Sequence, residues 1–264
     1  MPENPLVAFP PQFAYYRKLL TSDEQRAYDQ LADALTRLQF TVKLPLLAPD
    51  RLSRVFTALR YDHPERTFYI DFNTAVGFTC RSLFGGSTTV KVEPLFSVPE
   101  IQQKLELVAA YTRRIQQRRQ ALGVCGEREI AHWLHDVLAS AIHYGGMDRP
   151  EAFTLLGAVE GEAVCEGIAV LYKYLCSIFG VHSFVVIGHL ESDGSISDSE
   201  NNHAWNIVHI GSQNLFVDVT CDLTDTGAPR QSCFAKTRAE LRATHRPGDL
   251  RAIPDITRWK AASI

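Results

Sequence analysis

The chain has 264 residues, of which 45% are hydrophobic and 22% are charged, a composition typical of a globular protein. Its 27 Lys and Arg against 30 Asp and Glu give a net charge of −3, so no basic field exists to hold a polyanion and we expect no nucleic-acid partner. The sequence has no apolar run near the ~18 residues of a membrane span and no secretory signal at its start, which predicts a soluble, cytoplasmic protein without a membrane partner.

The N-terminal part of the chain predicts two helices. Residues 22 to 25 (SDEQ) have the form of a capping box, and apolar residues at helical spacing follow them. We therefore expect a helix over about residues 22 to 38. Pro99 begins a second, longer helix, which ends near Gly123.

Two segments between these helices predict strands. Residues 67 to 72 and residues 87 to 93 are rich in β-branched and aromatic side chains, which pack well on a pleated sheet. Together with the two helices, they predict an α+β extension over residues 1 to 122. A second domain is then expected over residues 123 to 264.

A third helix is predicted over about residues 127 to 142. His132 and His135 lie three positions apart on the face opposite its apolar stripe, close enough to share a metal ion. No carboxylate or third ligand accompanies the pair in a recognisable pattern, so ordinary helix histidines are the favoured interpretation. Zinc hydrolysis through these two residues and another histidine is the least favoured alternative.

Six cysteines are spread along the chain with neither a CxxC pair nor a dense framework. They are Cys80, Cys125, Cys165, Cys176, Cys221 and Cys233. This distribution indicates free thiols in a reducing compartment rather than a disulfide scaffold or a thiolate zinc site. At least one of these thiols is a candidate nucleophile.

Cys165 lies at the beginning of a predicted helix that Gly180 ends. The apolar stripe of this helix consists of Val164, Ile168, Leu171, Leu175 and Ile178. In the first helical turn, the unpaired N–H groups and the helix dipole favour a thiolate over a thiol. The alternative is that Cys165 is a small buried hydrophobic residue, whereas Cys176 lies deeper in the helix, without that field.

Downstream of this helix, the sequence predicts a β-hairpin. Residues 203 to 210 alternate in the manner of a strand, and residues 215 to 220 form the returning strand. Gly211 and Ser212 between them have the form of a two-residue turn. This turn sets the register, so that residue 210 pairs with residue 213.

In that register, Asp218 pairs with Trp205 and Thr220 pairs with His203. Asp218 then shares a face of the sheet with His203 at a diagonal distance of roughly 7 Å, where a carboxylate reaches an imidazole. The alternative is a strand-end histidine and an exposed aspartate, but a charge in an apolar strand is costly to bury unless it is paired. A thiolate needs a base and a group that orients the base, so Cys165, His203 and Asp218 form a candidate triad.

Three motifs in this order resemble the transglutaminase-like superfamily, which includes bacterial transglutaminase-like cysteine proteases. They are Ala-Val-Cys-Glu-Gly-Ile-Ala at 163 to 169, His-Ala-Trp-Asn at 203 to 206 and Val-Asp-Val-Thr at 217 to 220. The resemblance covers about residues 127 to 223. It implies an α+β, papain-like core in which the Cys-bearing helix packs on an antiparallel sheet, with no metal and no organic cofactor.

The resemblance also implies the role of each site residue. Cys165 would be the nucleophile, His203 the general base and Asp218 the group that orients the imidazole. The backbone N–H of Cys165 is the expected first donor to the oxyanion. His143 and Tyr144 are the candidates for the second donor.

The sequence departs from the family's pattern at two positions. Ile168 stands where an aromatic residue is common, and Cys221 stands where members often carry Trp. We expect both departures to affect the substrate cleft without contacting the triad.

The predicted function is therefore acyl transfer by a cysteine nucleophile on amide bonds of peptide or protein substrates. Hydrolysis by a peptidase or amidase is favoured. A transamidase, in which a lysine amine replaces water as the acceptor, is the first alternative. A non-catalytic protein-binding module on the same fold is the second, because a fold alone does not guarantee chemistry.

Overall fold

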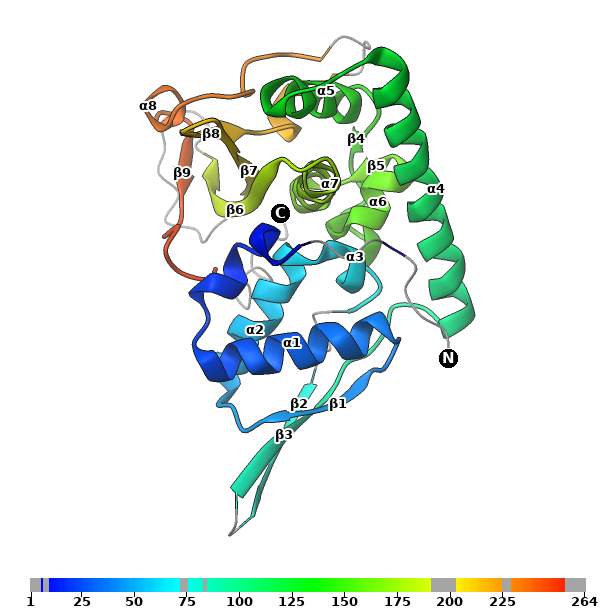
Figure 1. Ribbon diagram of the computed structural model, residues 1–264, viewed down its shortest axis with the longest axis vertical. Helices are drawn as coiled ribbons and strands as arrows, with labels where there is room; N and C mark the ends of the chain where they lie inside the picture. Colours follow the sequence, from blue (N-terminus) through cyan, green and yellow to red (C-terminus); the bar gives the residue numbers. More distant parts are fainter. Residues whose placement is uncertain are drawn as a thin grey trace. The chain divides into compact units, whose positions relative to one another are not determined.

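The computed structural model of the chain describes residues 6, 10–71, 76–82, 85–190, 203–224 and 229–254 (Figure 1). The chain divides into two compact units, Met1–Ala109 with Arg251–Asp255 and Ala110–Leu250 with Ile256–Ile264. The division falls within helix α4 (Val98–Leu122), and the expected boundary after residue 122 stays a prediction. Among the helices of the described residues, none has both the length and the apolar character to cross a membrane.

The first unit combines helices with a three-stranded antiparallel sheet. Its elements are η1 (Pro11–Phe13), η2 (Tyr16–Leu19), α1 (Ser22–Thr36), β1 (Thr41–Pro45), α2 (Pro49–Asp62), α3 (Pro64–Thr67), β2 (Val76–Ser82) and β3 (Gly85–Lys91). The strand order is β1-β3-β2. Helix α1 packs against α2 and β1 because its apolar stripe faces them.

Both predicted N-terminal helices are present, with one correction at a helix start. The capping box of α1 begins at Thr21, one residue earlier than expected, because the Thr21 N–H donates to Glu24 Oε2 at 2.7 Å. The long helix is α4, and Gly123 follows it with a left-handed φ of 67°.

The strand expected at residues 67 to 72 is wrong, while the strand at 87 to 93 is present as β3. Thr67 ends α3, which Pro64 begins, and Ile70 forms only an isolated bridge with Pro94. Residue 72 lies outside the described residues. A helical turn begun by proline overrides the local β-propensity here, because it buries Phe68 and Tyr69 in the core.

The second unit has the mixed α+β composition expected for the C-terminal part of the chain. Its helices and 3₁₀ turns are α5 (Glu127–Ala139), η3 (Pro150–Phe153), α6 (Leu155–Glu160), α7 (Cys165–Ile178), η4 (Thr220–Asp222) and α8 (Arg238–Leu241). Its strands are β4 (His143–Tyr144), β5 (Glu162–Ala163), β6 (His182–Leu190), β7 (His203–Ile210), β8 (Gln213–Val217) and β9 (His245–Pro247). The antiparallel sheet has the order β8-β7-β6-β9.

Helix α7 forms the centre of this unit. It packs on β6 and β7 and also contacts α5 and α6 (Figure 1). Every residue from 165 to 177 is buried, because sheet and helices surround α7 on all sides. The expected packing of the Cys-bearing helix on an antiparallel sheet is confirmed.

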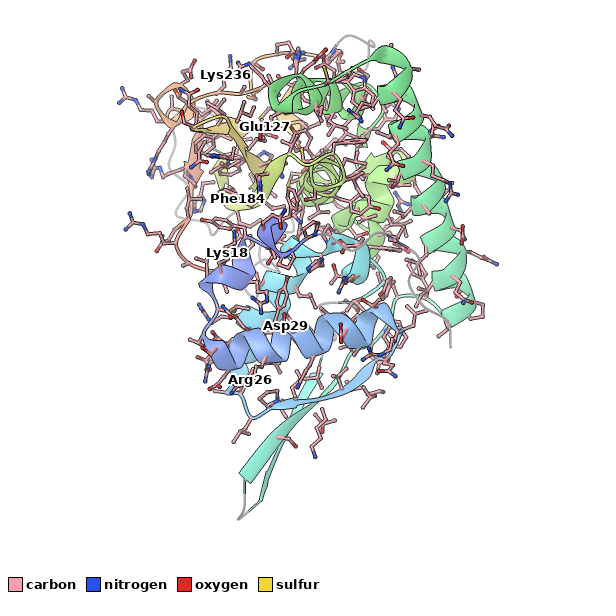
Figure 2. All side chains as sticks on the ribbon, in the orientation of Figure 1. Lys18, Arg26, Asp29, Glu127, Phe184 and Lys236 are labelled. Atoms are coloured by element: carbon pink, nitrogen blue, oxygen red, sulfur yellow. The ribbon has the colours of Figure 1, made fainter. Side chains whose placement is uncertain are left out.

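The hairpin of β7 and β8 has the expected turn and register. Ile210 pairs with Gln213, and Gly211 has a φ of 61°. The Gly211 N–H donates to the carboxylate of Glu127, labelled in Figure 2, at 3.0 Å and so ties the turn to α5. Strand β8 ends at Val217, however, so the expected pairs of Asp218 with Trp205 and of Thr220 with His203 do not form.

Candidate active site

Cys165 is the first residue of α7, and its side chain is 4% exposed. Gly167, two positions later, allows the backbone around η3 to pack closely against the first turn of α7. A Cβ on Gly167 would lie 2.3 Å from the Ala152 carbonyl oxygen and 2.8 Å from that of Thr154. The absence of a side chain at Gly167 therefore lets the segment around η3 cover the beginning of the helix.

His203 and Asp218 are brought together as expected, by a different local route. His203 Nε2 donates to Asp218 Oδ2 at 2.7 Å, and the Cys165 side chain lies close enough to the same imidazole to raise its pKa. Since Nε2 is used by Asp218, Nδ1 is the nitrogen left for the thiol. Trp205 stacks on the His203 ring with centroids 5.8 Å apart and fixes its plane. The three residues predicted from the sequence therefore lie together in the structure. Their catalytic roles remain a prediction.

Asp218 reaches His203 from a turn instead of a strand. Its Oδ1 accepts hydrogen bonds from the backbone N–H groups of Thr220 at 3.0 Å and Cys221 at 3.3 Å. An aspartate side chain that accepts a hydrogen bond from the backbone N–H two residues later favours a turn. Here the turn follows the end of β8 and leads into η4. The carboxylate is thereby aimed at the beginning of β7.

The site's electrostatics favour a charged pair. Burial lowers the pKa of His203, but the charge and hydrogen bond of Asp218, together with Cys165, outweigh burial and raise it to about 10. Burial raises the pKa of Asp218, yet His203 and the hydrogen bonds from His203, His245 and Cys221 hold it well below its usual range. Asp218 is therefore ionised and His203 carries a proton on both ring nitrogens at neutral pH.

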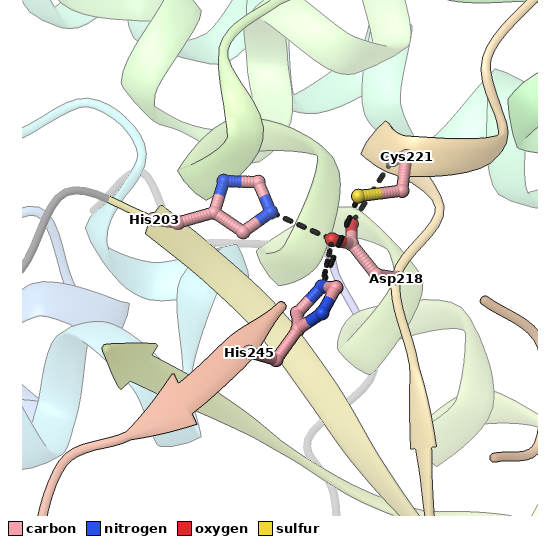
Figure 3. Close-up of side chains that lie close together, drawn as sticks. All are labelled: His203, Asp218, Cys221 and His245. Carbon is pink, nitrogen blue, oxygen red and sulfur yellow. Dashed lines mark hydrogen bonds and ion pairs between the residues drawn. The ribbon is translucent and has the colours of Figure 1, made fainter. Parts of the chain in front are cut away.

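His245 is a site residue that the sequence analysis missed. Its Nε2 donates to Asp218 Oδ2 at 2.9 Å, beside the hydrogen bond from His203 (Figure 3). It comes from the three-residue strand β9, which is too short to show an alternating pattern. The sequence carried no local signal that would have marked it.

Cys221 contacts the triad, so the expectation that it would not is wrong. Besides the backbone hydrogen bond to Asp218, its Sγ lies 3.8 Å from His245 Nε2. The turn that ends β8 brings Cys221 back toward Asp218 (Figure 3). Ile168, the other departure, is buried in α7.

Four side chains in this cluster offer ligand atoms of the kinds that zinc prefers. One ligand atom from each of His203, Asp218, Cys221 and His245 lies within 4.8 Å of the others. The hydrogen-bonded pairs are only 2.7 Å and 2.9 Å apart, however, whereas two ligands of one tetrahedral zinc lie about 3.3 Å apart. This geometry is that of a hydrogen-bonded cluster, so a metal would have to displace both imidazole–carboxylate hydrogen bonds.

His132 and His135 do not lie in a group of potential metal ligands among the described residues. His135 is fully buried, contrary to the expected outward face, with Nδ1 2.9 Å from Asp136 and Nε2 3.1 Å from Asp222. His132 Nε2 contacts Gln231 at 2.9 Å. The Asp222–His135 contact ties η4, and therefore the turn that carries Asp218, to α5.

Tyr144 lies next to the nucleophile. Parallel pairing of β4 with β5 places Tyr144 opposite Ala163, two residues before Cys165. The Tyr144 hydroxyl lies close enough to the side chain and to the backbone N–H of Cys165 for both to affect its pKa. Burial, followed by the charge of Cys165, raises the pKa of Tyr144 to about 12, so it is a neutral phenol at neutral pH. Of the two expected oxyanion donors, Tyr144 is the one with these contacts.

No protein-family model and no curated protein matches this chain. Among solved structures, a transglutaminase (TGase) has a TM-score of 0.37 and 11% identity over 75% of this chain and 55% of its own. A candidate cysteine protease from Cytophaga hutchinsonii has a TM-score of 0.33 and 14% identity over 67% of this chain and 74% of its own. The chain thus spans little more than half the length of that transglutaminase.

Proposed function

We propose that this chain is a cysteine-dependent acyl-transfer enzyme that acts on amide bonds of peptides or proteins. Cys165 is the nucleophile, His203 the base and Asp218 the group that orients His203. One observation carries the proposal: the His203 imidazole is hydrogen-bonded to the Asp218 carboxylate and lies close enough to the Cys165 side chain for that group to raise its pKa. The thiol also lies at the first residue of a helix, where a negative charge is stabilised.

The first half of the reaction forms a thioester. Because its pKa is raised to about 10 beside an ionised Asp218, His203 holds the proton as an imidazolium, and the reactive form pairs this imidazolium with the Cys165 thiolate. The thiolate attacks the amide carbonyl carbon, and the imidazolium gives its proton to the nitrogen that leaves as an amine. In the second half, neutral His203 takes a proton from water, the hydroxide attacks the thioester, and a carboxylic acid departs while the thiol is restored.

The oxyanion formed in each half needs donors at Cys165. The backbone N–H of Cys165 is one, and the Tyr144 hydroxyl lies close enough to it for the N–H to affect the Tyr144 pKa. A substrate carbonyl oxygen that takes over this N–H lies next to the phenol, whose O–H then becomes the second donor. Tyr144 is half exposed and so has room to make this adjustment.

Water is the proposed acceptor, which makes the chain a peptidase or amidase. The test incubates a peptide library with the protein, with and without a primary amine, and identifies the products by mass spectrometry. Cleavage products that appear with or without the amine support hydrolysis, while glutamine residues that carry the amine mean transamidation instead. No product of either kind from folded protein would overturn the proposal in favour of a binding module.

A matched pair of variants in α7 ties the activity to one thiol. Cys165→Ala removes the proposed nucleophile, whereas Cys176→Ala removes a fully buried thiol of the same helix, and burial raises the pKa of that thiol to about 12. We expect the first variant to abolish product formation and the second to retain it. Equal activity in both variants would assign the chemistry to another group.

A further inference from the structure

The Asp218 carboxylate receives more donors than a triad requires. Oδ2 accepts one hydrogen bond from His203 Nε2 at 2.7 Å and a second from His245 Nε2 at 2.9 Å (Figure 3). Oδ1 accepts two from the backbone N–H groups of Thr220 and Cys221. A fully buried carboxylate is stable only when its oxygens are satisfied, and His245 is the side chain that shares Oδ2 with the proposed base.

A contact at Nδ1, the ring nitrogen that does not face Asp218, fixes the orientation of the His245 ring. Thr244 Oγ1 lies 2.8 Å from His245 Nδ1, so Nε2 is the nitrogen that faces Asp218. Trp205, which stacks on His203, also meets His245 edge to face with centroids 5.2 Å apart. Both imidazoles are therefore held against the same indole while they share one carboxylate oxygen.

The sheet is built to bring His245 this close. Strand β6 lies between β7 and β9, and Gly188 pairs with His203 on one side and with Pro247 on the other. A Cβ on Gly188 would lie 2.4 Å from the Arg246 carbonyl oxygen and 2.5 Å from Trp205 Cη2. Only glycine at this position leaves room for both β9 and the Trp205 indole beside β6.

We propose that His245 is a positioning residue of this site: by donating Nε2–H to Asp218 Oδ2 it holds the carboxylate in the plane that orients His203 toward Cys165. The inference rests on the proposed function. Without His245, Oδ2 keeps a single donor, and the carboxylate is held less firmly in the plane that faces His203. Turnover then falls because the imidazole is misaligned, while substrate binding is unaffected.

The test compares two substitutions at one position. His245→Gln keeps an N–H donor at about the reach of Nε2, whereas His245→Leu keeps the bulk and removes the donor. We expect His245→Leu to lower kcat about 10- to 100-fold, the range for one lost hydrogen bond to a charged group, with KM nearly unchanged. His245→Gln should recover most of the loss. His209→Leu is the matched control, since His209 is an exposed histidine of the same sheet that bonds to Asn214.

A second readout does not need a substrate. The rate at which iodoacetamide alkylates Cys165 is followed against pH, in a Cys125→Ser background that removes an exposed thiol. We expect His245→Leu to shift this pH profile and His209→Leu to leave it as in the wild type. If no peptide is turned over by any variant but the profile still shifts, the proposed function fails and the role of His245 stands.

Two results would overturn the inference. One is a His245→Leu variant whose kcat and alkylation profile both equal those of His209→Leu. The other is equal loss of kcat in the Gln and Leu variants when their circular dichroism and thermal unfolding match the wild type. If His245→Leu does not fold, Thr244→Val replaces it, because it keeps the ring and removes the hydroxyl that orients it. Wild-type kcat in Thr244→Val would then refute the role.

Discussion

Replacing Asp218 by asparagine tests the site most directly. The change keeps the shape of the side chain but replaces one oxygen, a hydrogen-bond acceptor, with an NH₂ group, a donor. The carboxylate takes four hydrogen bonds, two on each oxygen. An amide has one oxygen, so its NH₂ must face either the two imidazoles or the two backbone N–H groups, donor against donor. If it faces His203, the ring escapes the clash by moving its proton from Nε2 to Nδ1, where it can no longer accept the Cys165 proton.

The size of the effect follows from these contacts. A buried pair broken on one side costs about 3–5 kcal/mol, so we expect Asp218→Asn to lower the free energy of unfolding by a large part of that range. In a serine protease, the corresponding change, which leaves the histidine in the wrong tautomer, lowers turnover by about 10⁴. A thiol gives up its proton more easily than a hydroxyl, so we expect a loss here of about 10² to 10³ in kcat.

The assay measures kcat and KM on a peptide found by the library experiment, with thermal unfolding recorded for each variant. Asp222→Asn is the matched control, because Asp222 is an equally buried carboxylate bonded to an imidazole, that of His135. The control should lose stability but keep kcat within a few fold of the wild type. Turnover by Asp218→Asn at the wild-type rate would refute the orienting role of Asp218.

Three further predictions concern the same site. Limiting iodoacetamide at about pH 6 should label Cys165 before the exposed Cys125, because an ordinary thiol with a pKa near ~8.5 is protonated there, and His203→Ala should remove this preference; peptide mapping that finds even labelling would contradict it. Since Asp218 and Cys165 raise the pKa of His203 from 6.5 to about 10, its contribution to stability is complete below pH 6.5 and is lost as the pH rises through about 10. The difference in unfolding free energy between the wild type and His203→Gln in urea should therefore shrink over that interval, and a constant difference would show that the pair does not form. Tyr144→Phe should lower kcat by about 10²-fold with little change in KM if the phenol is an oxyanion donor, whereas a rise in kcat/KM would mean that Tyr144 blocks the site.

Local patterns in the sequence were sufficient for the elements that carry Cys165 and His203. The apolar stripe of α7 predicts both a buried helix and a cysteine at its first turn, because a period of 3.6 residues is set by the chain itself. The Gly211 turn fixes the register of β7 and β8, since a two-residue turn leaves only one pairing. The contact of His203 with Asp218 was predicted from that register, but it forms through the turn that follows β8. The cost of burying an unpaired charge favours the contact by either route.

Local sequence patterns failed where two of them favoured different structures for the same segment. The segment after Pro64 has strand-forming residues, but the helical turn that proline begins prevailed there because it buries Phe68 and Tyr69. Asp218 was expected inside a strand, yet its side chain accepts a hydrogen bond from the Thr220 N–H in a turn, and the strand ends three residues early, at Val217. In both cases two local preferences were present, and packing selected one.

The sequence by itself determined the helix that bears Cys165, the hairpin that bears His203 and the order of the three motifs. Only the tertiary structure decided what surrounds Asp218. His245 lies 42 positions after His203 in a strand of three residues, and it reaches the carboxylate only because β9 pairs with β6 beside Gly188. Such a contact depends on which strands are neighbours in the sheet, and strand order is fixed by the packing of the whole unit, which no local period or turn encodes.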